Sequence, residues 1–170
     1  MSRKLVAIAA LVLAWGARAE VEAQERHVTA YGYLLGTWRC AHQVGSFSGT
    51  YTTTYTKALG DRWIRQVYEF PASEGKPAWR AEAIMGWDDR RQAWVRFLTL
   101  SNGEYFALRM AEKDGGWSWK YVSFFPRKSA ETAEPDAILT RKSDSEYSIE
   151  GPTYPQGGQM VTEHHQCKKG

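Results

Sequence analysis

The chain has 170 residues, with 22 lysines and arginines against 19 acidic residues. Three of the basic residues and none of the acids fall in residues 1–19, so the remaining 151 residues carry no net charge. A neutral chain of that length forms one domain and has no bulk attraction to nucleic acid or to an anionic membrane. Its eight tryptophans and nine tyrosines favour β-strands, because aromatic side chains pack well on a pleated surface.

The first segment has the pattern of an export signal. Residues 1–19 combine a basic start, a short apolar run and the triplet Ala17-Arg18-Ala19 before Glu20. The run is shorter than the ~20 residues of a membrane-spanning helix, so we expect no stable membrane insertion. The sequence therefore predicts a signal peptide over 1–19 and a secreted or periplasmic protein, with an uncleaved anchor as the alternative.

The chain has two cysteines, Cys40 and Cys167. In an oxidising compartment such a pair usually forms one disulfide, which would join the first predicted strand to the last. Free thiols or a metal site are the alternatives. Two isolated cysteines without a CxxC pair favour the disulfide over metal ligation.

The elements follow a simple order. Residues 20–34 form a polar lead with a short helix that would plug one end of a barrel, and residues 35–170 form the β-domain. Turn-forming Gly, Asn and Asp separate most of its strands, and the proline-containing segment 151–158 is expected to be irregular. The ten predicted strands are 35–43, 49–59, 62–70, 78–87, 92–100, 104–110, 116–124, 137–142, 146–150 and 159–167.

No helical period interrupts these strands, which excludes a parallel sheet built from βαβ units. The even spacing and tight turns predict an all-β fold, an antiparallel up-and-down barrel of about ten strands. A two-sheet sandwich is the alternative.

Several short motifs carry a resemblance to a known fold. Leu35-Gly36-Thr37-Trp38 after the lead resembles the G-x-W signature of calycin-type barrels, which include lipocalins, fatty-acid-binding proteins and nitrobindins. Together with Leu59-Gly60, Gly86-Trp87-Asp88 and the terminal Cys-Lys-Lys, it is similar to a little-characterised group of small secreted bacterial calycin-like proteins. The resemblance covers roughly residues 34–169 and implies a barrel whose base Trp38 closes over the lead. It implies little about function, because one fold hosts many functions.

No catalytic signature is present. The chain lacks a nucleophile elbow, the paired-histidine motif of zinc proteases, a P-loop and a dinucleotide glycine pattern. We therefore expect a non-enzymatic protein with no cofactor and no metal site.

Arginines alternate with large apolar residues on three predicted strands, at Arg65, Arg96 and Arg109. If these faces line a barrel, the planar guanidinium groups would bind a carboxylate or phosphate, the arrangement that the resemblance to fatty-acid-binding proteins implies. Alternatively, the arginines lie outside and shield aromatic rings from water.

The strand over 78–87 places small residues between Trp79 and Trp87, which would leave space for a ligand or complement bulky neighbours in a filled interior. We therefore expect a small amphipathic or anionic ligand inside the barrel. The predicted ligand-binding residues are Trp63, Arg65, Trp79, Trp87, Arg96 and Arg109.

A histidine pair in the last strand supports a different reading. The two-residue period of a strand places His165 and Glu163 on the same face as Cys167, which a disulfide to Cys40 would turn inward. Nitrobindins hold haem through a histidine near the C-terminus, so the resemblance implies a haem alternative with His165 as axial ligand, acting on reactive nitrogen or oxygen species. The simpler alternative is that the partly exposed histidine pair forms a structural hydrogen bond and binds nothing. A filled barrel that binds a protein partner is the third hypothesis.

Overall fold

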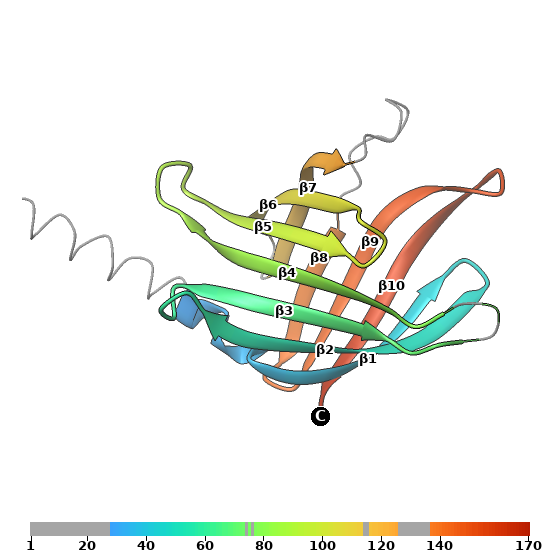
Figure 1. Ribbon diagram of the computed structural model, residues 1–170, viewed down its shortest axis with the longest axis horizontal. Coiled ribbons are helices and arrows are strands. Elements are labelled where there is room, and N and C mark those ends of the chain that lie inside the picture. Colours follow the sequence, from blue (N-terminus) through green and yellow to red (C-terminus); the bar gives the residue numbers. More distant parts are fainter. Residues whose placement is uncertain (1–27, 74, 76, 114–115, 126–136) are drawn as a thin grey trace, which may run out of the picture.

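The computed structural model describes residues 28–73, 75, 77–113, 116–125 and 137–170. The predicted signal peptide and residues 20–27 of the predicted lead lie outside the described residues. Ten antiparallel strands close into a barrel in the order β1-β10-β9-β8-β7-β6-β5-β4-β3-β2 (Figure 1). This closed strand order confirms the predicted all-β antiparallel barrel. No helix in the described part of the chain has the length and apolar character needed to cross a membrane.

All ten predicted strands are present, and only β9 is much longer than expected. A short 3-10 helix, η1 (Gly32–Leu34), precedes them. The strands are β1 (Gly36–Val44), β2 (Phe47–Ala58), β3 (Trp63–Phe70), β4 (Trp79–Asp88), β5 (Ala93–Leu100), β6 (Tyr105–Lys113), β7 (Gly116–Phe125), β8 (Ala137–Ser143), β9 (Glu146–Gln156) and β10 (Gln159–Lys169).

The prediction of irregular structure over 151–158 is wrong, because β9 continues through its prolines. Strand β8 pairs with β9 as far as Glu150, and beyond that point β9 pairs only with β10 among the described residues. Pro152 and Pro155 lack a backbone N–H, and a strand paired on one side tolerates that loss. The tight turn at Gly157 and Gly158, both with positive φ, closes the hairpin.

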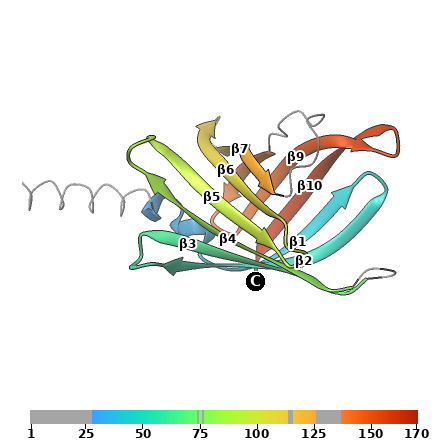
Figure 2. The same cartoon turned by 45° about the horizontal axis from the view of Figure 1, so that its top comes forward.

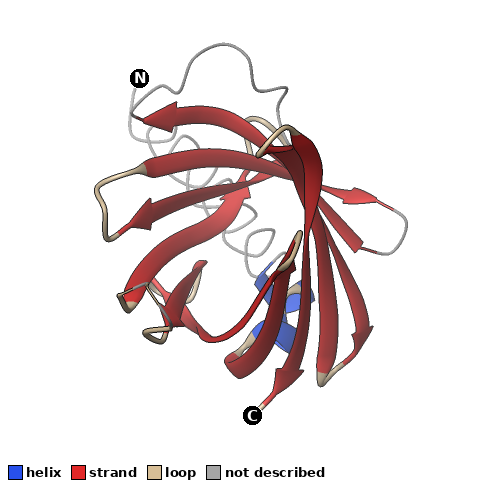
Figure 3. Ribbon diagram, turned by 90° about the vertical axis from the view of Figure 1, so that its right-hand side faces the viewer, coloured by secondary structure: helices blue, strands red, loops and turns tan. Residues whose placement is uncertain are grey.

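The helical residues before β1 close one end of the barrel, as the sequence predicted (Figure 3). Tyr31 and Leu34 are fully buried. The Tyr31 ring packs against Trp94 and Trp117, with ring centroids 4.2 and 4.3 Å away. The indole N–H of Trp38 donates a 2.6 Å hydrogen bond to the Leu34 carbonyl oxygen, so the G-x-W tryptophan fixes the plug to the barrel.

The interior holds a packed layer of apolar and aromatic side chains. Three buried polar residues, Thr53, Gln66 and Arg96, are cross-strand partners of residues in that layer. The hairpins β1-β2 and β9-β10 extend at the end away from the lead (Figure 2). Buried residues of the packed layer include Trp38, Tyr55, Ile64, Met85, Trp94, Met110, Leu139 and Tyr147.

A disulfide closes the seam between the first and last strands. Cys40 and Cys167 face each other in the β1-β10 register, and their sulfur atoms lie 2.01 Å apart. Both side chains are buried. The expected pairing is confirmed, and its inward direction fixes which faces of β1 and β10 line the interior.

Candidate functional site

The interior is not filled at the end of the barrel opposite the helical lead. A cavity of about 150 Å³ remains there, lined mainly by aromatic and aliphatic side chains. A dry protein cavity of about that volume holds one benzene molecule. Two polar regions interrupt the lining, one at Arg96 and one at Glu163 and His165. The other lining residues are Tyr51, Tyr68, Phe70, Trp79, Ala81, Leu98, Leu100, Phe106, Trp119, Ala137, Ile149, Gly151 and Pro152.

Arg96 lies at the inner end of this cavity and is only 2% exposed. Its Nη2 donates hydrogen bonds to the Tyr68 hydroxyl and, at 3.1 Å, to Oε1 of Gln66. The guanidinium also stacks over Trp119, 4.5 Å from the ring centroid. These three contacts hold the cation in one place.

The Arg96 charge has no acidic partner among the described residues. No carboxylate in that part of the chain forms an ion pair with it, and its buried Nε has no hydrogen-bond partner there. Burying a cation without a counter-charge is unfavourable, and an unsatisfied buried N–H adds to the cost. The cavity therefore contains a positive charge that no described carboxylate contacts directly, and Glu163, on the same lining, lies beside His165 instead.

A hydrogen-bond network centred on Gln66 sets the orientation of Arg96. The Gln66 amide nitrogen donates to the Tyr55 hydroxyl at 2.7 Å and to Thr53 Oγ1 at 3.1 Å. This leaves the Gln66 carbonyl oxygen to accept from Arg96. The Tyr55 and Tyr147 hydroxyls are 3.1 Å apart and extend the network across the barrel.

The buried tyrosines of this network make the fold sensitive to alkali. Burial raises the pKa of Tyr55 and Tyr147, and burial partly offset by Arg96 raises the pKa of Tyr68. In the unfolded chain tyrosines ionise near pH 10, so above that pH the folded state holds more protons than the unfolded state. Stability is then fully present below pH ~10 and falls as pH rises, by up to about 1.4 kcal/mol per pH unit for each tyrosine.

We therefore expect the urea midpoint to hold up to about pH 10 and to fall as the pH rises further, between about pH 10 and 12. Tyr55→Phe removes one of the titrating groups and should reduce the slope. Tyr105→Phe, at an exposed tyrosine, is the matched control and should leave the slope unchanged. A midpoint that stays constant through this range would contradict the account.

A second polar cluster forms the wall of the cavity between β1 and β10. His42 and His165 face each other in the register, and their rings stack with centroids 4.5 Å apart. Oε2 of Glu163 lies 3.3 Å from Nε2 of His165 and 3.9 Å from Nε2 of His42. The predicted inward direction of Glu163 and His165 is confirmed, whereas His164 is exposed.

The six predicted ligand-binding residues do not form one site, because Trp63, Trp87 and Arg109 line a separate hollow of about 660 Å³. Arg96 and Trp79 line the cavity, and Trp79, which is 40% exposed, stacks on Phe70 at the mouth. Trp87 faces inward at the closed end, with its ring centroid 6.4 Å from that of Trp94. Whether Arg96 and Trp79 bind a ligand stays a prediction.

The other three predicted residues lie on the outer face. Arg65 forms a two-point ion pair with Glu82, with nitrogen–oxygen distances of 2.6 and 2.9 Å, and Arg109 is exposed. Trp63 covers Gly86, where an added Cβ would come within 2.5 Å of the indole ring. The alternation of β3 and β6 places these side chains outside, because their neighbours in sequence face the core.

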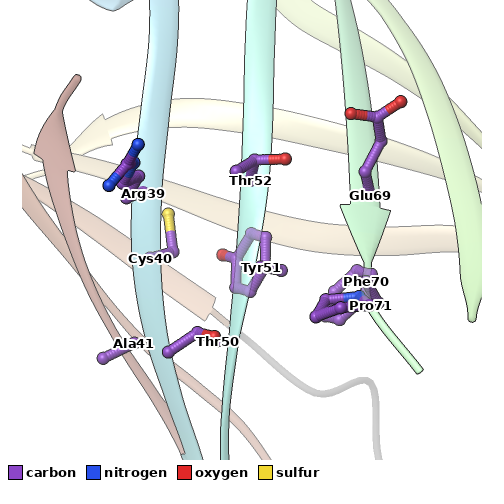
Figure 4. Close-up of a pocket in the computed structure, with 9 residues that line it drawn as sticks. All are labelled: Arg39, Cys40, Ala41, Thr50, Tyr51, Thr52, Glu69, Phe70 and Pro71. Carbon is purple, nitrogen blue, oxygen red and sulfur yellow. The ribbon is translucent and has the colours of Figure 1, made fainter. Parts of the chain in front are cut away.

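Two further hollows lie near the cavity. A vestibule of about 450 Å³ at the mouth is lined in part by His42, Phe70, Trp79 and Glu163. A groove of about 550 Å³ crosses β1, β2 and β3, with Arg39 and Glu69 on its rim (Figure 4). The groove presents both signs of charge, so its electrostatics favour no particular class of ligand.

No family model matches the chain, and no curated protein matches it. Among solved structures, it is similar to the crystal structure of Rv2717c from M. tuberculosis. The TM-score is 0.56 at 12% sequence identity, over 84% of this chain and 96% of that one. A likeness at this identity shows a shared fold and carries no information about ligand or activity.

Proposed function

We propose that this protein is a non-enzymatic, calycin-like binding protein that takes a small amphipathic anion into its barrel. The observation that carries the proposal is Arg96, a buried guanidinium in the lining of a largely apolar cavity, which has no ion-pair contact with a described carboxylate and an unsatisfied Nε. An anion that accepts a hydrogen bond from Nε would remove both the unpaired charge and the unsatisfied donor.

The cavity limits the size and character of the ligand. Its volume of about 150 Å³ fits one aromatic ring or a short branched alkyl chain. Phe70, Leu98 and Phe106 would contact this apolar part, while the acidic group points toward Arg96. A small hydrophobic monocarboxylate such as benzoate has both features.

The proposal includes export. A signal peptide over 1–19, a lead over 20–34 and a barrel over 35–170 would deliver a disulfide-bonded binding protein to an oxidising compartment. The buried Cys40–Cys167 pair supports this location, because disulfides persist mainly outside the cytoplasm.

The cavity beside His165 fits haem poorly. It holds about one benzene-sized group and is far too small for a porphyrin. We therefore derive no chemistry from haem, and the unfilled cavity favours a small ligand over a filled barrel that binds a protein partner.

The test is a titration with two probes of equal size and different charge. Benzoate and benzyl alcohol are added separately near pH 7, and binding is measured by calorimetry. We expect benzoate to bind with one-to-one stoichiometry and about 10- to 150-fold more tightly than benzyl alcohol, the range that a charge-assisted hydrogen bond supplies. Equal affinities, or no binding of benzoate, would overturn the proposal.

A further inference from the structure

We propose that His42, Glu163 and His165 form a binding site for a divalent transition-metal ion, with zinc as the best match. This site is separate from Arg96 and goes beyond the proposed anion binding. It rests on three facts of geometry: the donors come from two paired strands, their spacing matches a metal polyhedron, and one ligand has an orienting partner.

The register of β1 and β10 brings the donors together. Two residues beyond the paired cysteines, His42 lies opposite His165, and two residues further on, Val44 lies opposite Glu163. All three donor residues face the interior because they keep the parity of the buried disulfide. The β9-β10 register shifts between Thr162 and His164, so Glu163 sits at a local irregularity of the strand.

The distances between the donor atoms are close to those around a bound ion. Oε2 of Glu163 lies 3.3 and 3.9 Å from the two histidine Nε2 atoms, and all three donor atoms lie within 4.8 Å of one another. Zinc bonds of about 2.0–2.1 Å in tetrahedral geometry separate neighbouring ligand atoms by about 3.4 Å. Only small side-chain rotations are needed to complete the site.

The surroundings prepare His165 for ligation. Its Nδ1 lies 3.0 Å from the Tyr51 hydroxyl, which holds the ring so that Nε2 points toward Glu163. Tyr51 is itself held by stacking on Phe70, with ring centroids 4.5 Å apart. A hydrogen bond from the non-ligating nitrogen is the usual partner of a metal-bound histidine, because it fixes the tautomer and the ring orientation.

The donor set identifies the class of ion. Two neutral imidazoles and one carboxylate carry a single negative charge and suit zinc, cobalt and related divalent ions rather than calcium or magnesium. His42 and Glu163 also line the vestibule, so a further coordination position would face solvent. Water or a small exogenous ligand would occupy that position.

The test is a titration of the tag-free, disulfide-bonded protein with Zn²⁺ by calorimetry and with Co²⁺ by visible absorption. We expect one ion per chain and d–d bands of a low-coordinate cobalt site. Glu163→Gln and His42→Ala should each weaken metal binding by more than about 100-fold, because each removes a direct ligand. The loss of a residue that only hydrogen-bonds to a ligand weakens metal binding by at most about 100-fold. Tyr51→Phe should weaken it by about 10-fold, because it removes only the partner of Nδ1.

His164→Ala is the matched control, because His164 lies between two of the ligands in sequence but is exposed. It should leave both titrations unchanged, and Arg96→Met should also retain the ion. The proposal is overturned if the wild type binds no stoichiometric ion, if His164→Ala costs as much as His42→Ala, or if Glu163→Gln binds as tightly as the wild type. Glu163→Gln keeps the size of the side chain. If its thermal midpoint without metal equals that of the wild type, its weaker metal binding reflects the lost ligand and not a loss of the fold.

Discussion

Replacing Arg96 by methionine is expected to weaken benzoate binding by about 10- to 150-fold. Methionine fills similar space but removes the cation and the Nε donor that an anion would use. The ligand-free protein should change little in stability. The lost hydrogen bonds to Gln66 and Tyr68 are offset by removal of an unneutralised buried charge.

Calorimetric titration with benzoate measures this effect, and urea unfolding checks the fold. Arg65→Met is the matched control, because it removes the same charge from the outer face, where Arg65 pairs with Glu82. Its benzoate affinity should equal that of the wild type. An Arg96→Met protein that binds benzoate within about threefold of the wild type would contradict the role of Arg96, as would an equal loss in Arg65→Met.

Removing the disulfide is expected to lower the free energy of unfolding by up to about 5 kcal/mol. Cys40 and Cys167 are 127 positions apart, so the bond greatly restricts the unfolded chain. Domains of this size have a total stability of about 5–15 kcal/mol, so the loss is a large share of the whole. The bond that is lost lies at the seam where β1 pairs with β10 and closes the barrel.

Urea unfolding of the oxidised wild type, the reduced wild type and the Cys40→Ala/Cys167→Ala variant measures the contribution. The reduced wild type separates the cross-link from the packing of the two sulfur atoms, since both thiols remain in place. We expect both altered forms to unfold at lower urea than the oxidised protein. A difference below about 1 kcal/mol would show that the cross-link adds little.

The barrel could be predicted from the sequence because its signals are local. Tyr51, Thr53 and Tyr55 alternate with threonines, and the structure buries the tyrosine face while the intervening threonines are exposed or half-buried. The G-x-W motif also placed Trp38 at the base. Each of these inferences needs only strand periodicity and the turns between strands.

The inside of β3 could not be assigned in this way. Trp63 and Val67 alternate with Ile64 and Tyr68, so both faces carry bulky apolar side chains. A shift of one residue exchanges the two faces completely. Gln66 faces inward because β2 and β5 supply its hydrogen-bond partners, and those contacts are not visible in one strand.

His42 was missed although a signal for it was present. Once Cys40 and Cys167 are paired across antiparallel strands, the residue two positions after the first must face the residue two positions before the second. That rule places His42 opposite His165. The approach of Glu163 to both rings could not be derived, because it depends on the side-chain conformations at the irregularity in β10.

The central claim, that Arg96 binds an anion inside the barrel, is tested most directly by NMR of arginine side chains. The protein is labelled with ¹⁵N-arginine, and the Nε–H signal of Arg96 is assigned by its absence from the Arg96→Met spectrum. We predict that benzoate shifts this signal in a saturable way, that benzyl alcohol does not, and that Arg65 and Arg109 stay unchanged. An Arg96 signal that benzoate leaves in place while the outer arginines move would contradict the claim.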